Sequence, residues 1–98
     1  MKIKIHKSYR DVIAICDSEL LGKNFEQGNF QLNLTGEFFN GDEKSEQETF
    51  EVIKDLAKED ATFNLVGKKA IAVALKAGII SKEGIKTIQN VPFALVLL

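Results

Sequence analysis

Residues 61–78, ATFNLVGKKAIAVALKAG, contain the clearest helical pattern in this sequence. Apolar residues recur along them at helical spacing, namely Val66, Ala70, Val73, Ala74 and Ala77. Because most of these residues are small, the spacing predicts a helix whose apolar face can lie close against a sheet. Gly78 is expected to end the helix, since glycine adopts positive φ at little cost. The start of the helix is marked less sharply, and we expect Thr62 or Asn64 to cap it.

Two segments near the start of the chain have the patterns of neighbouring strands. Residues 2–6, KIKIH, alternate strictly between polar and apolar side chains, which predicts a half-buried strand with both isoleucines facing inward. Residues 12–16, VIAIC, form a nearly continuous apolar run, which is typical of a strand that is covered on both faces. The polar residues 8–11 between them suit a hairpin loop.

Two later segments also predict strands. Residues 30–35 alternate and indicate a strand with one solvated face, with residues 37–39 as a short extension. Residues 91–98, VPFALVLL, are expected to end the sequence as an apolar strand. A run this apolar must be covered on both faces or shared with another subunit.

A second helix is predicted by a capping box at Ser45 and Glu48, in which each side chain accepts a hydrogen bond from the other residue's backbone amide. This helix would pack through Phe50, Ile53 and Ala57, which fall on one face. Together the patterns predict one α+β domain over residues 1–98. Its mostly antiparallel sheet would have about four strands, with two main helices on one face.

A short turn is predicted between the second strand and the segment that follows it. We expect Asp17 to cap this turn at residues 18–21, because its carboxylate can accept hydrogen bonds from the first free amides. Gly22 is expected to end the turn.

The composition is that of an ordinary soluble protein, with 45% hydrophobic and 28% charged residues among 98. A single cysteine, Cys16, allows no internal disulfide, so a cytoplasmic location is expected. No apolar run approaches the ~20 residues of a membrane-spanning helix, so no membrane contact is expected.

The net charge of −1 hides an uneven distribution. Residues 37–60 carry nine acidic and three basic side chains, whereas residues 61–98 carry five basic and one acidic side chain. The five basic residues are candidates for contact with RNA or an acidic partner: Lys68, Lys69, Lys76, Lys82 and Lys86. The simpler interpretation is that two solvated helix faces have opposite signs.

Few catalytic or metal-binding chemistries can be built from this sequence. His6 is the only histidine and Cys16 the only cysteine, which leaves no usual zinc ligand set, and we expect no metal and no cofactor. Gly67 and Lys68 lie near a helix start, where anions bind, but the full phosphate-loop spacing is missing. Asp17 and Glu19 could pair as acid and base, although capping explains Asp17 more simply, so we assign no catalytic residue.

Three pieces of the sequence resemble an archaeal family known as domain of unknown function 424. They are ICDSELLGK at residues 15–23, NLVG at residues 64–67 and the dipeptide at residues 91–92. The turn residues that carry the first piece are Asp17, Glu19, Gly22 and Lys23. The resemblance implies a small archaeal α+β protein that has no established activity and whose genes lie near translation genes.

The sequence departs from the family pattern after Pro92. Phe93 and Leu95 stand where the family often has a histidine and a glutamine, which favours a packing or interface role for this segment. Our first hypothesis is a small non-enzymatic binding protein, associated with ribosomal RNA or a ribosomal protein through the basic last third. One alternative is a homo-oligomer or protein-assembly module that uses the apolar C-terminal strand. The other is an enzyme of unrecognised type centred on residues 16–23.

Overall fold

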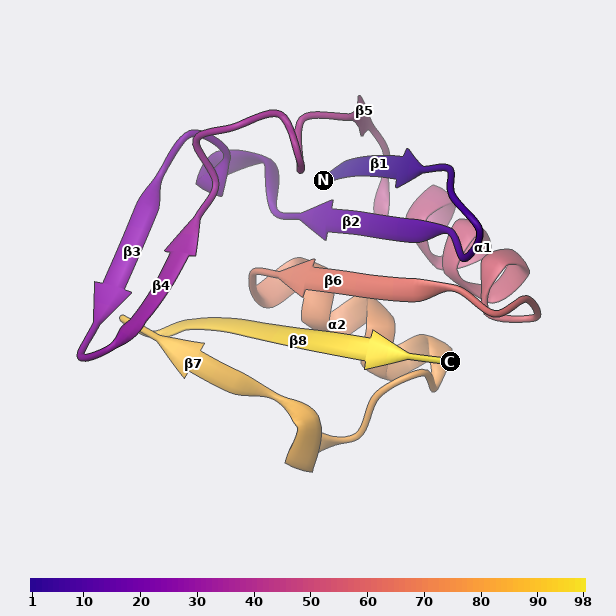
Figure 1. The fold of residues 1–98 in the computed structure, drawn as a ribbon. Helices are drawn as coiled ribbons and strands as arrows, with labels where there is room; N and C mark the ends of the chain where they lie inside the picture. Colours follow the sequence, from indigo (N-terminus) through magenta and orange to yellow (C-terminus); the bar gives the residue numbers. More distant parts are fainter.

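A mixed six-stranded sheet lies in front of two helices in the computed structural model, which describes residues 1–98 (Figure 1). The strand order is β5-β1-β2-β6-β8-β7, and every neighbouring pair is antiparallel except β2 and β6. The strands are β1 (Lys2–His6), β2 (Val12–Cys16), β5 (Asp42–Glu43), β6 (Thr62–Val66), β7 (Lys86–Ile88) and β8 (Val91–Leu97). The α+β prediction is confirmed, with six strands in this sheet instead of about four.

The remaining elements join the strands. The helices are α1 (Glu46–Leu56) and α2 (Lys68–Ala77), and a separate hairpin consists of β3 (Asn24–Gln27) and β4 (Phe30–Asn33). Two single 3₁₀ turns, η1 (Ser18–Leu20) and η2 (Lys82–Gly84), complete the order. Neither helix combines the length and the apolar character that crossing a membrane requires.

Strand β6 corrects our reading of residues 61–78. The helix does not begin near Thr62 or Asn64, because Thr62–Val66 is a central strand and α2 begins only at Lys68. Phe63 and Leu65 point to the helix side, where both are almost fully buried. Thr62 and Asn64 therefore face the other side of the sheet, and neither caps a helix. The alternation of TFNLV is a strand period, which the stronger helical period after it had masked.

The main core lies between the sheet and the two helices. Ile13, Ile15 and Phe63 contribute from the strands, and each is fully buried. Ala70 and Ala74 of α2 are also fully buried, so the small residues predicted for this helix do pack against the sheet. Close approach of α2 is possible because alanine keeps the backbone near the strands.

The capping box of α1 forms as predicted. Ser45 Oγ accepts a hydrogen bond from the Glu48 amide at 3.1 Å, and Glu48 Oε1 accepts one from the Ser45 amide at 3.0 Å. The hydrogen bonds from Ser45 hold the pKa of the Glu48 carboxyl below its usual value. The helix packs through Thr49 and Ile53, which are fully buried, whereas Phe50 and Ala57 are only half-buried.

A second, smaller cluster lies on the other side of the sheet, under the β3–β4 hairpin. Its buried members are Ala14, Cys16, Leu34, Phe39 and Val66. The strand predicted at residues 30–35 is the β4 half of this hairpin, but residues 37–39 form a turn and bend instead of extending it. Burial is the main cause that raises the pKa of the Cys16 thiol to about 11, so the thiol is protonated at neutral pH.

Replacing Phe63 by alanine is expected to lower the free energy of unfolding by about 3–5 kcal/mol, because the large ring is fully buried at the centre of the core. Urea denaturation followed by circular dichroism measures this loss. Leu97→Ala on the neighbouring strand β8 is the matched control, since Leu97 is 69% exposed and should change stability by less than about 0.5 kcal/mol. Equal losses in the two variants would contradict the assignment of the core to the helix side.

Candidate functional site

The three sequence pieces that carry the family resemblance meet at one end of the parallel strands β2 and β6. Asp17 directly follows β2 and Gly67 directly follows β6, so both lie where the two strands end. The Asp17 amide donates to Val66 O at 3.0 Å, and the Gly67 amide donates to Pro92 O at 2.8 Å. A hollow of about 140 Å³ opens here, lined by Asp17, Glu19, Leu20, Gly67, Lys68, Asn90, Val91 and Pro92.

Asp17 caps helix α2 and not the turn that follows it in sequence. Its side chain is almost fully buried, with 4% of the residue exposed. Oδ2 accepts a hydrogen bond from the Lys69 amide at 3.0 Å, and Oδ1 accepts one from the Ala70 amide at 2.8 Å. The turn η1 has no side-chain cap, so the local capping prediction is wrong. The N-terminus of a ten-residue helix offers free amides and a favourable dipole, which a single turn offers only weakly.

Gly67 is the residue that lets this cap form. Its φ of 109° is unfavourable for residues with a side chain. A Cβ atom placed on it would lie 2.3 Å from Cγ of Asp17, which is far inside van der Waals contact. Because both carboxylate oxygens of Asp17 are engaged by backbone amides, the geometry favours a structural role for this residue over acid–base chemistry.

The other residues of the turn lie around this cap. Glu19 is exposed, and its Oε1 lies 3.8 Å from Nζ of Lys69. Gly22 has a φ of 87°, as expected for a residue that ends a turn, and its amide donates to Leu34 O. Lys23 is exposed at the entrance to β3. The turn therefore joins the end of β2 to the hairpin, and an exposed ion pair such as Glu19–Lys69 contributes little to stability.

The five predicted contact lysines are all exposed but do not form one cluster. Lys68 and Lys69 begin α2, whereas Lys76 lies in its last turn with Nζ 5.5 Å from the centre of the Phe50 ring. Lys82 belongs to η2 and Lys86 to the edge strand β7. The structure thus brings Lys68 and Lys69 next to Asp17 and Glu19 and spreads the others over three elements.

The side of the sheet that faces away from the helices is only partly covered. Strand pairing places Lys4, Ala14, Asn64 and Leu95 in one row across β1, β2, β6 and β8. The next row consists of His6, Val12, Thr62 and Leu97. Ala14 is fully buried in the smaller cluster, and we call the other seven residues the open face. This face was not predicted, because Thr62 and Asn64 were expected to be candidate caps of the helix; the alternation of TFNLV was the available signal.

Two leucines of β8 dominate the open face. Leu95 is 61% exposed and Leu97 is 69% exposed, whereas Ala94 and Val96 between and beside them are buried on the helix side. Phe38, 43% exposed, stacks on His6 with the ring centres 4.5 Å apart. The strand that was expected to be covered on both faces or shared with another subunit is thus covered on only one face within the single chain.

Strand β8 also has a free edge along the same residues. It pairs with β6 from Phe93 to Leu97, but with β7 only at residues 91–93. Pro92 O accepts a hydrogen bond from the Gly67 amide, and the Leu98 amide donates one to Ala61 O. The backbone groups of these two residues therefore point toward β6. Because backbone groups alternate between the two sides of a strand, those of Leu95 and Leu97 point away from β6, toward the free edge.

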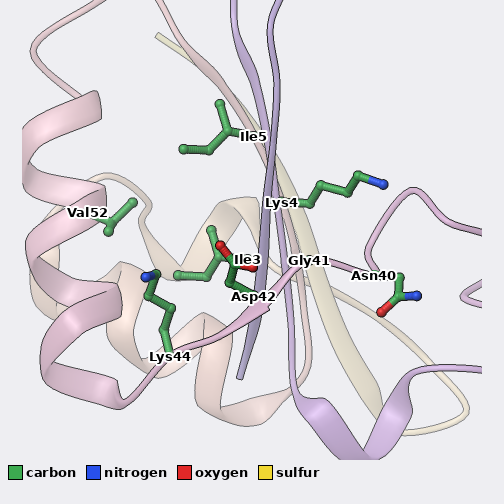
Figure 2. Close-up of a pocket in the computed structure, with 8 residues that line it drawn as sticks. All are labelled: Ile3, Lys4, Ile5, Asn40, Gly41, Asp42, Lys44 and Val52. Carbon is green, nitrogen blue, oxygen red and sulfur yellow. The ribbon is translucent and has the colours of Figure 1, made fainter.

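A larger hollow of about 440 Å³ lies at the opposite edge of the sheet, between β1, β5 and α1. Figure 2 shows Ile3, Ile5 and Val52 on its apolar side, with Lys44 and Asp42 beside them. No histidine, cysteine or hydroxyl side chain lines it. No group of three or more His, Cys, Asp or Glu side chains in residues 1–98 is arranged to hold a metal ion.

Replacing Asp17 by alanine is expected to lower the free energy of unfolding by about 2–3 kcal/mol, because two amides at the start of α2 lose a charged, buried partner. Amide hydrogen exchange should accelerate at Lys69 and Ala70 before other parts of the helix. Glu19→Ala removes the neighbouring exposed acid and serves as the control, with an expected change below about 0.5 kcal/mol. An Asp17→Ala variant as stable as this control would show that the cap is unimportant.

Comparison with known proteins identifies the fold and the family of this chain. No curated protein matches the sequence. A crystal structure of an uncharacterized conserved protein from Methanopyrus kandleri has the same fold, with a TM-score of 0.86, 22% sequence identity and coverage of 98% of this chain and 90% of that one. A family model described as "Protein of unknown function (DUF424)" matches residues 6–98. Because this match spans nearly the whole sequence, the chain belongs to the DUF424 family.

Proposed function

We propose that this chain is a small non-enzymatic binding protein whose contact surface is the β8 side of the open face. The observation that carries the proposal is the exposure of Leu95 and Leu97, at 61% and 69%, on an ordered strand of the main sheet. Burying the rest of each side chain in a contact is worth about 1–2 kcal/mol. Two adjacent leucines beside a free strand edge mark a contact surface more clearly than scattered exposed apolar residues do.

The polar cluster at residues 16–23 supports catalysis less well. The Cys16 thiol is fully buried, and its pKa is raised to about 11, so it is a poor nucleophile. Asp17 already accepts two backbone hydrogen bonds. Glu19 is exposed, and its nearest charged partner is Lys69. These contacts explain the turn as part of the fold and leave the open face as the better candidate for function.

A photo-crosslinking side chain placed at Leu97 tests the proposal in cells that produce the protein. We expect a discrete protein adduct from position 97, because this side chain would lie inside the contact. The same crosslinker at Ala72, which is exposed on α2 in the helix layer, should give none. Adding Leu95→Ser to the position-97 probe should weaken the adduct by at least tenfold without unfolding the chain. An adduct from position 72 alone would contradict the proposal.

Contact with RNA of the translation machinery is a second candidate, favoured by the charge of α2. This helix contains no acidic residue and exposes Lys68, Lys69 and Lys76. Lysines on one helix can hold a phosphate backbone without reading its sequence. The family resemblance implies an association with translation genes, which is consistent with such a contact.

Sedimentation of cell extract at low and high salt tests the RNA candidate. If α2 holds ribosomal RNA, the chain should co-migrate with ribosomal particles at low salt and leave them at high salt, because phosphate contacts depend steeply on salt. Replacing Lys69 and Lys76 by glutamate should abolish co-migration. Lys54→Glu, on the exposed side of the acidic helix α1, is the matched control and should leave it unchanged. Migration as a free small protein at both salt concentrations would count against RNA contact.

A further inference from the structure

We infer that the free edge of β8 binds the same edge of a second copy of this chain, so that two sheets join into one. The inference rests on the proposed function, since it names the partner of the β8 surface. Three properties of the strand support it: its unpaired backbone groups, its lack of charge and its ability to pair with a second copy of itself.

The unpaired backbone groups lie at Leu95 and Leu97. Pairing with β7 ends at Phe93, whose Cα partner is Lys86, because β7 begins at Lys86 and the preceding residues form η2 outside the sheet. Among the backbone hydrogen bonds outside the regular strands, none joins residues 94–97 to the segment before β7. The amides and carbonyls of Leu95 and Leu97 thus form a short template for an additional strand.

The devices that usually keep such an edge from pairing are missing here. Protected edges carry lysine, inward-pointing charge or proline. Strand β8, VPFALVL, contains no charged residue, and its proline lies in the half that β7 already covers. The two outermost strands of the sheet differ from it. β5 has two residues, both acidic, and β7 begins with Lys86.

An antiparallel pairing of two copies satisfies the edge on both sides. With a two-fold axis at Val96, Leu95 would pair with Leu97 of the partner subunit, and Leu97 with Leu95 of the partner subunit. Each of these two residue pairs would exchange two backbone hydrogen bonds. All four leucine side chains would then lie on the same face, where neighbouring strands bring such pairs within ~5.5 Å. The contact is isologous, so it closes at two copies.

The exposed surfaces of the helices fit this strand less well than a second strand does. The exposed positions of α1 are all polar or charged, and those of α2 are three lysines and Ala72. Neither surface offers apolar side chains that could cover Leu95 and Leu97. Uncharged leucines and a free backbone are matched best by the same uncharged strand. One strand pair makes a small interface, so we expect a dimer that dissociates at roughly micromolar concentration.

Sedimentation equilibrium of the purified chain between about 1 and 500 μM tests the association, and cysteine crosslinking tests its register. Val96→Cys should form an intermolecular disulfide under mild oxidation, because the two-fold axis brings the two positions to about 4.5 Å between Cα atoms. Ala94→Cys, on the same side of the same strand, is the control. It would face residue 98 of the partner subunit and should not crosslink with itself. The native Cys16 lies on β2, which β6 separates from β8, so it is far from the free edge and should not interfere.

Leu97→Pro tests the backbone contribution separately. It removes only an amide that points to the free edge, so the β6 pairing should survive while the dimer weakens at least tenfold. Leu97→Ser keeps that amide and should weaken the dimer less. A monomer at every concentration, or equal crosslinking at positions 94 and 96, would overturn the inference. If the chain is monomeric yet the position-97 photo-adduct contains a different protein, the dimer is wrong and the proposed function stands.

Discussion

The buried carboxylate of Asp17 at the start of α2 is the interaction on which the rest of the structure depends. It joins the end of β2 to amides 52 and 53 residues later in the chain, and so places the helix over the parallel pair β2 and β6. A carboxylate at a helix N-terminus is favoured by both the free amides and the dipole. Gly67 is required beside it, because any Cβ atom there would overlap the carboxylate.

This interaction also explains why the family motifs need not be catalytic. The pieces around Asp17, Gly67 and Pro92 are far apart in sequence, but they meet at one junction through backbone hydrogen bonds. Polar residues held in this way serve the fold. A contact surface needs groups that the fold itself does not already engage. The exposed leucines and the free backbone edge of β8 are such groups.

The surfaces of the molecule also differ in charge. Acidic residues gather on and around α1, and lysines are exposed along α2. Strand β8, which lies between β6 and β7 in the sheet, carries no charge. The charged side chains of the helix layer are exposed to solvent. The uncharged strand remains available for a contact that depends on apolar burial and backbone hydrogen bonds, so the two kinds of contact need not compete.

Much of the fold could be predicted because local patterns were in agreement with it. The period-2 alternation of residues 2–6, the apolar run of 12–16 and the Ser45–Glu48 capping box depend on nearby residues, and each element forms as predicted. One detail is wrong: Ile5 was expected to be buried like Ile3, but it is 41% exposed. The centre of the sheet could not be predicted in the same way. Thr62–Val66 has only five residues before a strongly periodic helix, and its strand state comes from pairing with β2 and β8.

The sequence by itself determined the α+β class, the helix ends at Ser45 and Gly78 and the uneven charge, because each follows from spacing over a few residues or from composition. Only the tertiary structure decided that Asp17 caps a distant helix and that Asn64 lies on a sheet face. It also decided that Leu95 and Leu97 stay exposed beside a free edge. These features depend on which strands become neighbours, and a local pattern cannot specify the partner across a sheet.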